Sequence, residues 1–155
     1  MSNIVAFLQC PWFEPGTSRE AIDHYRTDQE FHRRLLSGTM SGRRLLMAFG
    51  KDMFHSIWWD NVAPNHVERS GGVSATDMRH VERVISEQDP RIILTFGRQA
   101  EEAISRSIGA IRVKVFSCHH PNARFRTQAD LDNFAQGVRD WIADHQVVME
   151  DIDES

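Results

Sequence analysis

Cysteine is scarce in this sequence, which has only two among its 155 residues. Two thiols cannot build a four-cysteine zinc or iron–sulfur site. The eight histidines do not supply a site either, because they lack the spacing of metal ligands: His24 and His32 lie eight positions apart, and His119 and His120 are adjacent. We therefore expect no metal ion and no other cofactor.

Long hydrophobic runs are also missing. No apolar stretch approaches the roughly 18 residues that a membrane-spanning helix needs. The segment Met1–Cys10 has no basic start followed by a small-residue cleavage site, which argues against a signal peptide. We expect a cytoplasmic protein without a membrane partner, in which Cys10 and Cys118 are free thiols.

An excess of positive charge is missing as well. The formal net charge is −4 at pH 7, which argues against nucleic-acid binding because phosphate neutralisation drives such affinity. However, four acidic residues crowd the last six positions, as in a solvated terminus: Glu150, Asp151, Asp153 and Glu154. Without them the formal charge is near zero, so a local basic face is compatible with the composition.

Two kinds of apolar segment alternate along the chain. Short β-branched or aromatic runs predict four strands, at Asn3–Gln9, His55–Asp60, Arg91–Phe96 and Ile111–Phe116. Helical spacing of apolar residues predicts helices over 19–36, 43–49, 78–85, 98–107 and 128–142. Ser18 is the expected cap of the first helix, and capping boxes are expected at Ser74 with Asp77 and at Thr127 with Asp130.

Strands that alternate with helices indicate a mainly parallel sheet covered on both faces. The fold class predicted here is α/β, with three αβα layers around a central four-stranded sheet. The chain has 41% hydrophobic and 26% charged residues and shows no internal repeat or linker. We expect one domain over residues 1–148, followed by an acidic tail over 149–155, and a monomeric protein.

Three loops of unusual composition follow the first, second and fourth predicted strands. They are Gln9–Gly16, Asp60–Pro64 and His119–Asn122. In a parallel sheet these loops emerge at one edge, where open α/β folds bind ligands. An amide, an imidazole and aromatic rings at that edge suit the recognition of a flat heterocycle.

These loops resemble motifs of the uracil-DNA glycosylase superfamily, in matching order and over nearly the whole chain. The first family motif, Gln-Asp-Pro-Tyr-His-Gly-Pro-Gly, shares four of its eight residues with Gln9–Gly16, and Trp12 stands at its tyrosine. The family's asparagine after the second strand is similar to Asn61, and its His-Pro pair after the fourth strand to His120 and Pro121. The segment Arg91–Ala103 also resembles the family's third strand and following helix.

The resemblance implies catalytic roles for Gln9, Cys10 and His120. His120 would donate a hydrogen bond to the negative charge that develops on the departing base, a contribution on the order of 3 kcal/mol. Asn61 would pair with the N3–H and O4 edge of uracil, and Trp12 would form the pocket wall beside C5.

The remaining implied contacts are with the flipped base and with DNA. Either Phe13 or Phe31 would stack on the base, and the sequence does not choose between them. The implied DNA contacts are Pro121 of the His-Pro pair and, after it, Asn122, Arg124 and Arg126. The pairs Arg33-Arg34 and Arg43-Arg44 fit solvated helix faces, and one of them could touch phosphate.

Cys10 departs from the family pattern, because efficient members have an aspartate there that holds the attacking water. Other branches have asparagine, so a residue other than a carboxylate is compatible with activity. Loss of a general base typically costs ~10²–10⁴ in rate. Glu14 and Asp60 are the candidate substitutes.

The sequence thus predicts a DNA glycosylase that flips uracil or a related modified pyrimidine out of DNA and hydrolyses its N-glycosidic bond. The alternative is a module of the same fold with weak or no catalysis, which binds nucleic acid, a nucleotide or a protein. A third hypothesis is that the chain is an unrelated, doubly wound domain that binds a nucleotide. Against it stands the lack of a Gly-rich phosphate loop, since Gly97-Arg98 alone is a weak signal.

Overall fold

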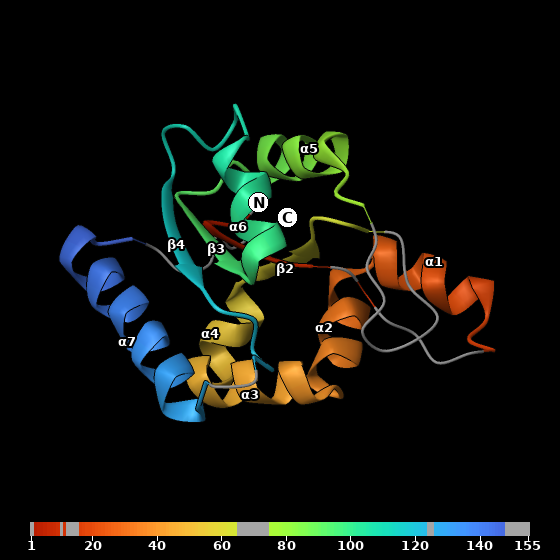
Figure 1. Cartoon of the computed structure of the whole chain (residues 1–155), viewed down its shortest axis with the longest axis horizontal. Coiled ribbons are helices and arrows are strands. Elements are labelled where there is room, and N and C mark those ends of the chain that lie inside the picture. Colours follow the sequence, from red (N-terminus) through yellow and green to blue (C-terminus); the bar gives the residue numbers. More distant parts are fainter. Residues whose placement is uncertain (1, 10, 12–15, 65–74, 124–125, 148–155) are drawn as a thin grey trace, which may run out of the picture.

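Four parallel strands form one sheet with helices on both faces in the computed structural model of the chain (Figure 1). The structure describes residues 2–9, 11, 16–64, 75–123 and 126–147. The strands are β1 (Ile4–Leu8), β2 (Trp58–Asn61), β3 (Ile92–Phe96) and β4 (Lys114–Cys118). The helices are α1 (Arg19–Thr27), α2 (Gln29–Ser37), α3 (Met40–Phe49), α4 (Lys51–Ser56), α5 (Met78–Gln88), α6 (Arg98–Ser105) and α7 (Gln128–His145). The predicted three-layer α/β fold is confirmed.

The sheet order is β2-β1-β3-β4, and each neighbouring pair is parallel. The central strands β1 and β3 are buried along their whole length. Their sequences, Ile-Val-Ala-Phe-Leu and Ile-Ile-Leu-Thr-Phe, are almost continuously apolar because helices cover both faces of the sheet. The polar exception, Thr95, donates its hydroxyl proton to Ser117 Oγ at 2.8 Å.

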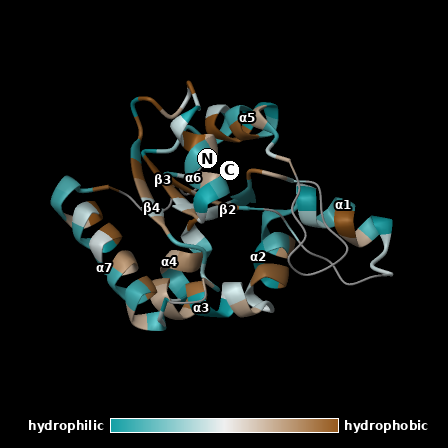
Figure 2. Cartoon of the chain, viewed as in Figure 1, coloured by the Kyte–Doolittle hydropathy of each residue, from teal (hydrophilic) through white to brown (hydrophobic). Residues whose placement is uncertain are grey.

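Successive residues of β1 supply two separate cores. Ile4, Ala6 and Leu8 pack into the core formed with α2, α3, α4 and α7. Val5 and Phe7 pack into the core formed with α5 and α6. In Figure 2 hydrophobic and hydrophilic segments alternate along α5 and α7, as expected for helices that present one apolar face to the sheet.

The predicted first helix is in fact two helices, and Asp28 separates them. The backbone N–H of Asp28 donates to His24 O and ends α1, while its carboxylate accepts from the N–H groups of Glu30 and Phe31 and caps α2. Asp28 has an extended backbone, with φ −120° and ψ 109°, so the apolar spacing continues across a bend. The predicted cap at Ser18 is confirmed, since its side chain accepts from Ala21 N–H.

The predicted limits of two strands are wrong. Instead of a strand from residue 55, α4 continues to Ser56 and β2 begins at Trp58. β4 covers Lys114–Cys118 rather than 111–116, and Ile111 is an exposed residue of the preceding turn. Pairing with β3 sets this register, with Ile92 opposite Lys114 and Phe96 opposite Cys118. As a result, His119 and His120 follow the strand directly.

Of the two expected capping boxes, the one at Thr127 and Asp130 is confirmed. At α5 the cap is Asp77 itself, whose carboxylate accepts from His80 N–H, and Ser74 lies outside the described residues. The expected acidic tail, 149–155, also lies outside the described residues.

Gly42 allows α2 and α3 to pack closely, because a Cβ at this position would overlap the backbone carbonyl of Leu36. We predict that Gly42→Ala lowers the free energy of unfolding by about 2–3 kcal/mol. The control is Gly137→Ala in α7, where nothing lies within 4 Å of the added Cβ. It should be neutral or stabilising by up to about 1 kcal/mol. Urea unfolding followed by circular dichroism measures both, and equal effects would contradict the packing argument.

Candidate functional site

The carboxyl ends of the strands lie along one edge of the sheet in the order β2, β1, β3, β4. Asn61 is the last residue of β2, Gln9 follows β1, Gly97 follows β3, and His120 lies two residues after β4. The predicted motif residues that the structure describes therefore reach the same edge, as parallel pairing requires.

His120 and Gln9 line one cavity at this edge, with a volume of about 540 Å³. The other described lining residues come from the junction of β3 and α6: Gly97, Arg98, Gln99 and Glu102. Gly97 has a φ of +96°, and a Cβ there would lie 3.6 Å from His120 Cβ. Glycine thus provides a turn that other residues rarely adopt, close against the histidine side chain.

The protonation of His120 follows from its surroundings. Burial, together with the neighbouring His119, lowers the pKa of His120, so its imidazole is neutral at pH 7. The backbone N–H of Asn122 donates to His120 Nδ1 at 3.1 Å. A neutral ring whose Nδ1 accepts must carry its proton on Nε2. His120 therefore presents an N–H donor without a net charge.

The adjacent Cys118 and His119 lack the properties of a reactive thiol pair. Burial raises the pKa of the Cys118 thiol to about 11, so the thiol is protonated at neutral pH. Burial and the charge of Arg126 lower the pKa of His119. Nδ1 of His119 lies 3.5 Å from Cys118 Sγ, and His119 is not a described lining residue of the His120 cavity.

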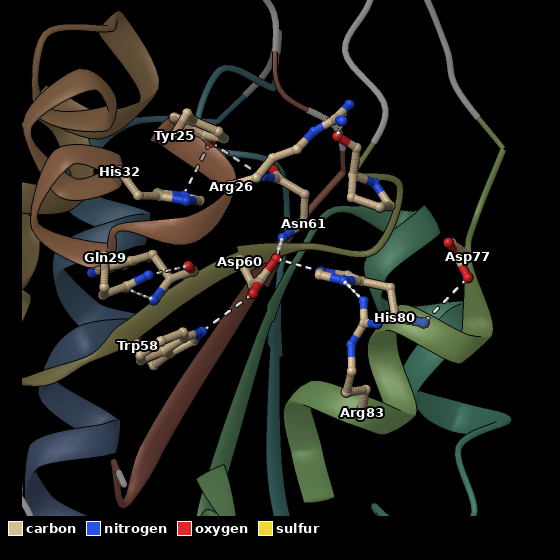
Figure 3. A network of polar contacts seen from close by, with 12 residues as sticks. Tyr25, Arg26, Gln29, His32, Trp58, Asp60, Asn61, Asp77, His80 and Arg83 are labelled. Carbon is tan, nitrogen blue, oxygen red and sulfur yellow. Dashed lines mark hydrogen bonds and ion pairs between the residues drawn. The ribbon is translucent and has the colours of Figure 1, made fainter. Parts of the chain in front are cut away.

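Asn61 lines a second cavity, of about 330 Å³, between α1, α2, β2 and α5 (Figure 3). Its side chain is buried, and Nδ2 donates to the Tyr25 hydroxyl at 3.1 Å. That hydroxyl lies 3.0 Å from His32 Nε2. Burial lowers the pKa of His32 to about 4, so its ring is neutral. The Tyr25 hydroxyl thus accepts from Asn61 and is hydrogen-bonded to His32, which fixes the orientation of the Asn61 amide.

A largely buried carboxylate, Asp60, borders the same cavity. Asp60 accepts from Asn61 N–H at 2.8 Å, from Trp58 Nε1 at 3.2 Å and from His80 Nε2 at 2.7 Å. Arg83 donates to the other ring nitrogen of His80 at 3.2 Å (Figure 3). Burial acts to raise the pKa of Asp60, but the hydrogen bonds from His80 and from the Asn61 N–H outweigh it and the net shift is downward. Asp60 is therefore an ionised structural group, and it is not a described lining residue of the His120 cavity.

Among the described residues, the side chains of Asn61 and His120 line different cavities. That the two hold one ring stays a prediction, because most of the loop after β1 lies outside the described residues. The two side chains extend from opposite ends of the strand order. With neighbouring strands about 4.8 Å apart, three steps separate β2 from β4 by about 14 Å. Both side chains would have to turn inward to reach one pyrimidine, and that of Asn61 turns toward Tyr25 on α1 instead.

Phe31 lines neither cavity. It is half-buried and stacks on His24 with ring centroids 4.1 Å apart, beside the pair Ile22 and Tyr25. Phe31 thus packs between α1 and α2, and its role as a platform for a base stays a prediction.

After His120, Pro121 is buried, whereas Asn122 and Arg126 are exposed. The exposed side chains are accessible to a polyanion such as DNA. The other predicted site residues, Cys10, Trp12, Phe13 and Arg124, lie outside the described residues, as does Glu14.

Sequence reasoning missed the partners that orient the two polar groups. The pair of Tyr25 and His32 depends on the bend between α1 and α2, which the apolar spacing hides. No local pattern marks His80 as the partner of Asp60, which lies 20 positions earlier in the sequence. Arg44, expected on a solvated helix face, is half-buried and donates to Pro121 O at 2.9 Å. That contact joins segments 77 positions apart and leaves no local signal.

The described residues include no group of three or more His, Cys, Asp or Glu side chains placed to hold a metal ion. Within the same part of the chain, no helix combines the length and apolar character needed to cross a membrane. Models of known protein families give no match to the chain, and neither do curated protein sequences. The relationship to the uracil-DNA glycosylase superfamily therefore stays a prediction from the motifs.

We predict that His32 makes folding sensitive to acid. Its pKa is about 4 in the fold against 6.5 in a model peptide. Between these pH values the unfolded chain binds more protons, so the free energy of unfolding falls as the pH decreases through this range. From pH 7 to pH 4.5 the loss from this residue should be about 2 kcal/mol. Urea unfolding at both pH values should show His32→Gln losing less stability than the wild type by that amount, and equal losses would refute the assignment.

Proposed function

We propose that this protein hydrolyses the N-glycosidic bond of uracil or a related modified pyrimidine in DNA. The motif resemblance suggests the reaction, and one observation carries the proposal. Gln9 and His120, from two different motifs, line one cavity at the carboxyl edge of the sheet. There His120 is held as a neutral donor with its proton on Nε2.

The reaction needs a group that stabilises negative charge on the leaving base. The bond between N1 of the base and C1′ breaks, and the base departs with the bonding electron pair. A water oxygen then bonds to C1′, and the water's proton is released. His120 Nε2–H would donate to the base carbonyl oxygen on which the charge collects. A donor aimed at such an oxyanion contributes about 3 kcal/mol, which is roughly two orders of magnitude in rate.

Stabilisation of the sugar cation is the weaker part of this site. Among the described lining residues, Glu102 is the carboxylate of the His120 cavity. It pairs with Arg98 at 3.1 Å, and its side chain is 62% exposed. Solvent and the paired cation both reduce its effect on a bound substrate. We therefore infer a slow hydrolase whose rate depends mainly on leaving-group stabilisation.

The partner we propose is DNA that contains the target base, bound by a monomeric, cytoplasmic protein. The exposed guanidinium groups of Arg98 and Arg126 would contact phosphate beside the His120 cavity.

The second candidate is a binding protein of the same fold that does not excise the base. It is favoured by the engagement of Asn61 with Tyr25 and by the separation of the two cavities. Cys10 in place of the family's aspartate favours it as well. Such a protein would hold a base, a nucleotide or a partner without cleaving a glycosidic bond.

The test is incubation with single- and double-stranded oligonucleotides that carry one deoxyuridine, followed by alkaline cleavage at abasic sites. We predict slow strand cleavage with wild type that His120→Ala reduces by about 10²–10³. Asn61→Ala should mainly lower the free energy of unfolding, because the Asn61 side-chain amide donates a hydrogen bond to the Tyr25 hydroxyl. A matched oligonucleotide with thymidine controls for specificity.

Each other outcome has a defined meaning. No cleavage by wild type, together with salt-sensitive DNA binding, would reject excision and support the second candidate. Equal rate losses in both variants at unchanged stability would mean that one substrate reaches both side chains, against the two-cavity geometry.

A further inference from the structure

Arg44 connects α3 to the turn that carries His120. Its Nη1 donates to the carbonyl oxygen of Pro121 at 2.9 Å, across 77 positions of sequence. The backbone carbonyl of Arg44 in turn accepts from Nε2 of Gln128, the first residue of α7, at 3.0 Å. The guanidinium is thus attached to a fixed backbone and contacts one specific atom of the turn.

That atom belongs to the peptide group that sets the His120 tautomer. The carbonyl of Pro121 and the N–H of Asn122 are the two ends of one peptide unit, which is planar and trans. The N–H end donates to His120 Nδ1 at 3.1 Å. Because the unit is rigid, an oxygen held by Arg44 fixes the direction of the N–H.

This peptide unit is the central one of a β-turn and can take two orientations there. Residues His120 to Ala123 form a β-turn, closed by a hydrogen bond from Ala123 N–H to His120 O at 2.9 Å. Pro121 is its second residue and suits turn types I and II equally, and these differ by a flip of the central peptide. Asn122, the third residue, does not have a positive φ, which excludes type II here. Asparagine tolerates a positive φ, so the sequence alone permits both forms.

We infer that Arg44 is a positioning residue that selects the orientation of the Pro121–Asn122 peptide and thereby keeps the His120 proton on Nε2. Its contribution to base release rests on the proposed function, whereas its effect on the turn does not. A flipped peptide would direct a carbonyl oxygen toward Nδ1 in place of the N–H. Nδ1 would then favour carrying a proton, and the donor at Nε2 would no longer be fixed.

Amide hydrogen exchange measured by NMR tests this inference on the full-length chain. In Arg44→Met the exchange rate of the Asn122 amide should rise on the order of tenfold, the worth of one hydrogen bond. The Ala123 amide should keep its protection, because its bond to His120 O is present in both turn types. The matched control is Arg43→Met, which removes the neighbouring exposed cation and should change neither amide.

Two results would overturn the inference. One is unchanged exchange of the Asn122 amide in Arg44→Met. The other is joint loss of protection at Asn122 and Ala123, which would mean that the turn melts and that Arg44 has only a structural role. If the methionine variant does not fold, Arg44→Gln, whose shorter side chain keeps polar character, is measured with the same expected and contrary results.

Kinetics separate this inference from the proposed function. If wild type releases uracil, Arg44→Met should lower kcat while KM for the oligonucleotide stays unchanged, and a rise in KM alone would instead assign Arg44 to DNA binding. If wild type releases no base, the proposed function fails, and the exchange rates alone decide the inference about Arg44.

Discussion

The parallel pairing of β1 with both β2 and β3 is the constraint on which the rest of the structure depends. Buried on both faces, β1 and β3 carry almost no polar side chains, so polar groups collect where the strands end. Parallel strands also require crossover helices, which form the two outer layers. Every candidate functional residue of the described chain lies at this edge or on a helix that borders it. The position of the candidate site is thus a consequence of the sheet topology.

The edge is divided into two regions of different electrostatic character. Around His120 the cavity is open, and the donor is neutral. Around Asn61 a largely buried carboxylate, two histidines and a tyrosine form a network of hydrogen bonds. Without these hydrogen-bond donors, the desolvated charge of Asp60 would cost much free energy. Loss of any of the donors should therefore destabilise the fold. Under the proposed function, the His120 region would bind the ligand, whereas the hydrogen bonds of the Asn61 region stabilise the fold.

Much of the fold could be predicted, because apolar runs and caps act locally. β1 and β3 were found from continuous apolar runs, and α7 from its capping box. The limits of β2 and β4 could not be predicted in this way. α4 continues to Ser56, directly before the apolar segment that contains β2, and the turn before β4 contains the β-branched residues Ile111 and Val113, as a strand would. Register is decided by pairing with a neighbour, as with Phe96 and Cys118.

The sequence predicts where on the sheet the candidate site lies, but it does not predict how the side chains of the site are oriented. His120, Gln9 and Asn61 follow their strands as the sequence indicates, but the sequence does not show that Asn61 turns toward Tyr25. The contact of Arg44 with Pro121 depends on how α3 meets the end of β4, and no short-range pattern encodes it. The sequence suggests a single pocket, whereas the described residues line two cavities. The difference comes from the direction of the Asn61 side chain.

The central claim is that a base binds in the cavity of Gln9 and His120. The most direct measurement is an NMR titration with an oligonucleotide carrying 2′-fluoro-2′-deoxyuridine, whose fluorine slows bond cleavage by disfavouring the sugar cation. The account predicts large shifts of the side-chain resonances of His120 and Gln9, with the Asn61 amide group unchanged. Shifts at Asn61 without shifts at His120 would contradict it.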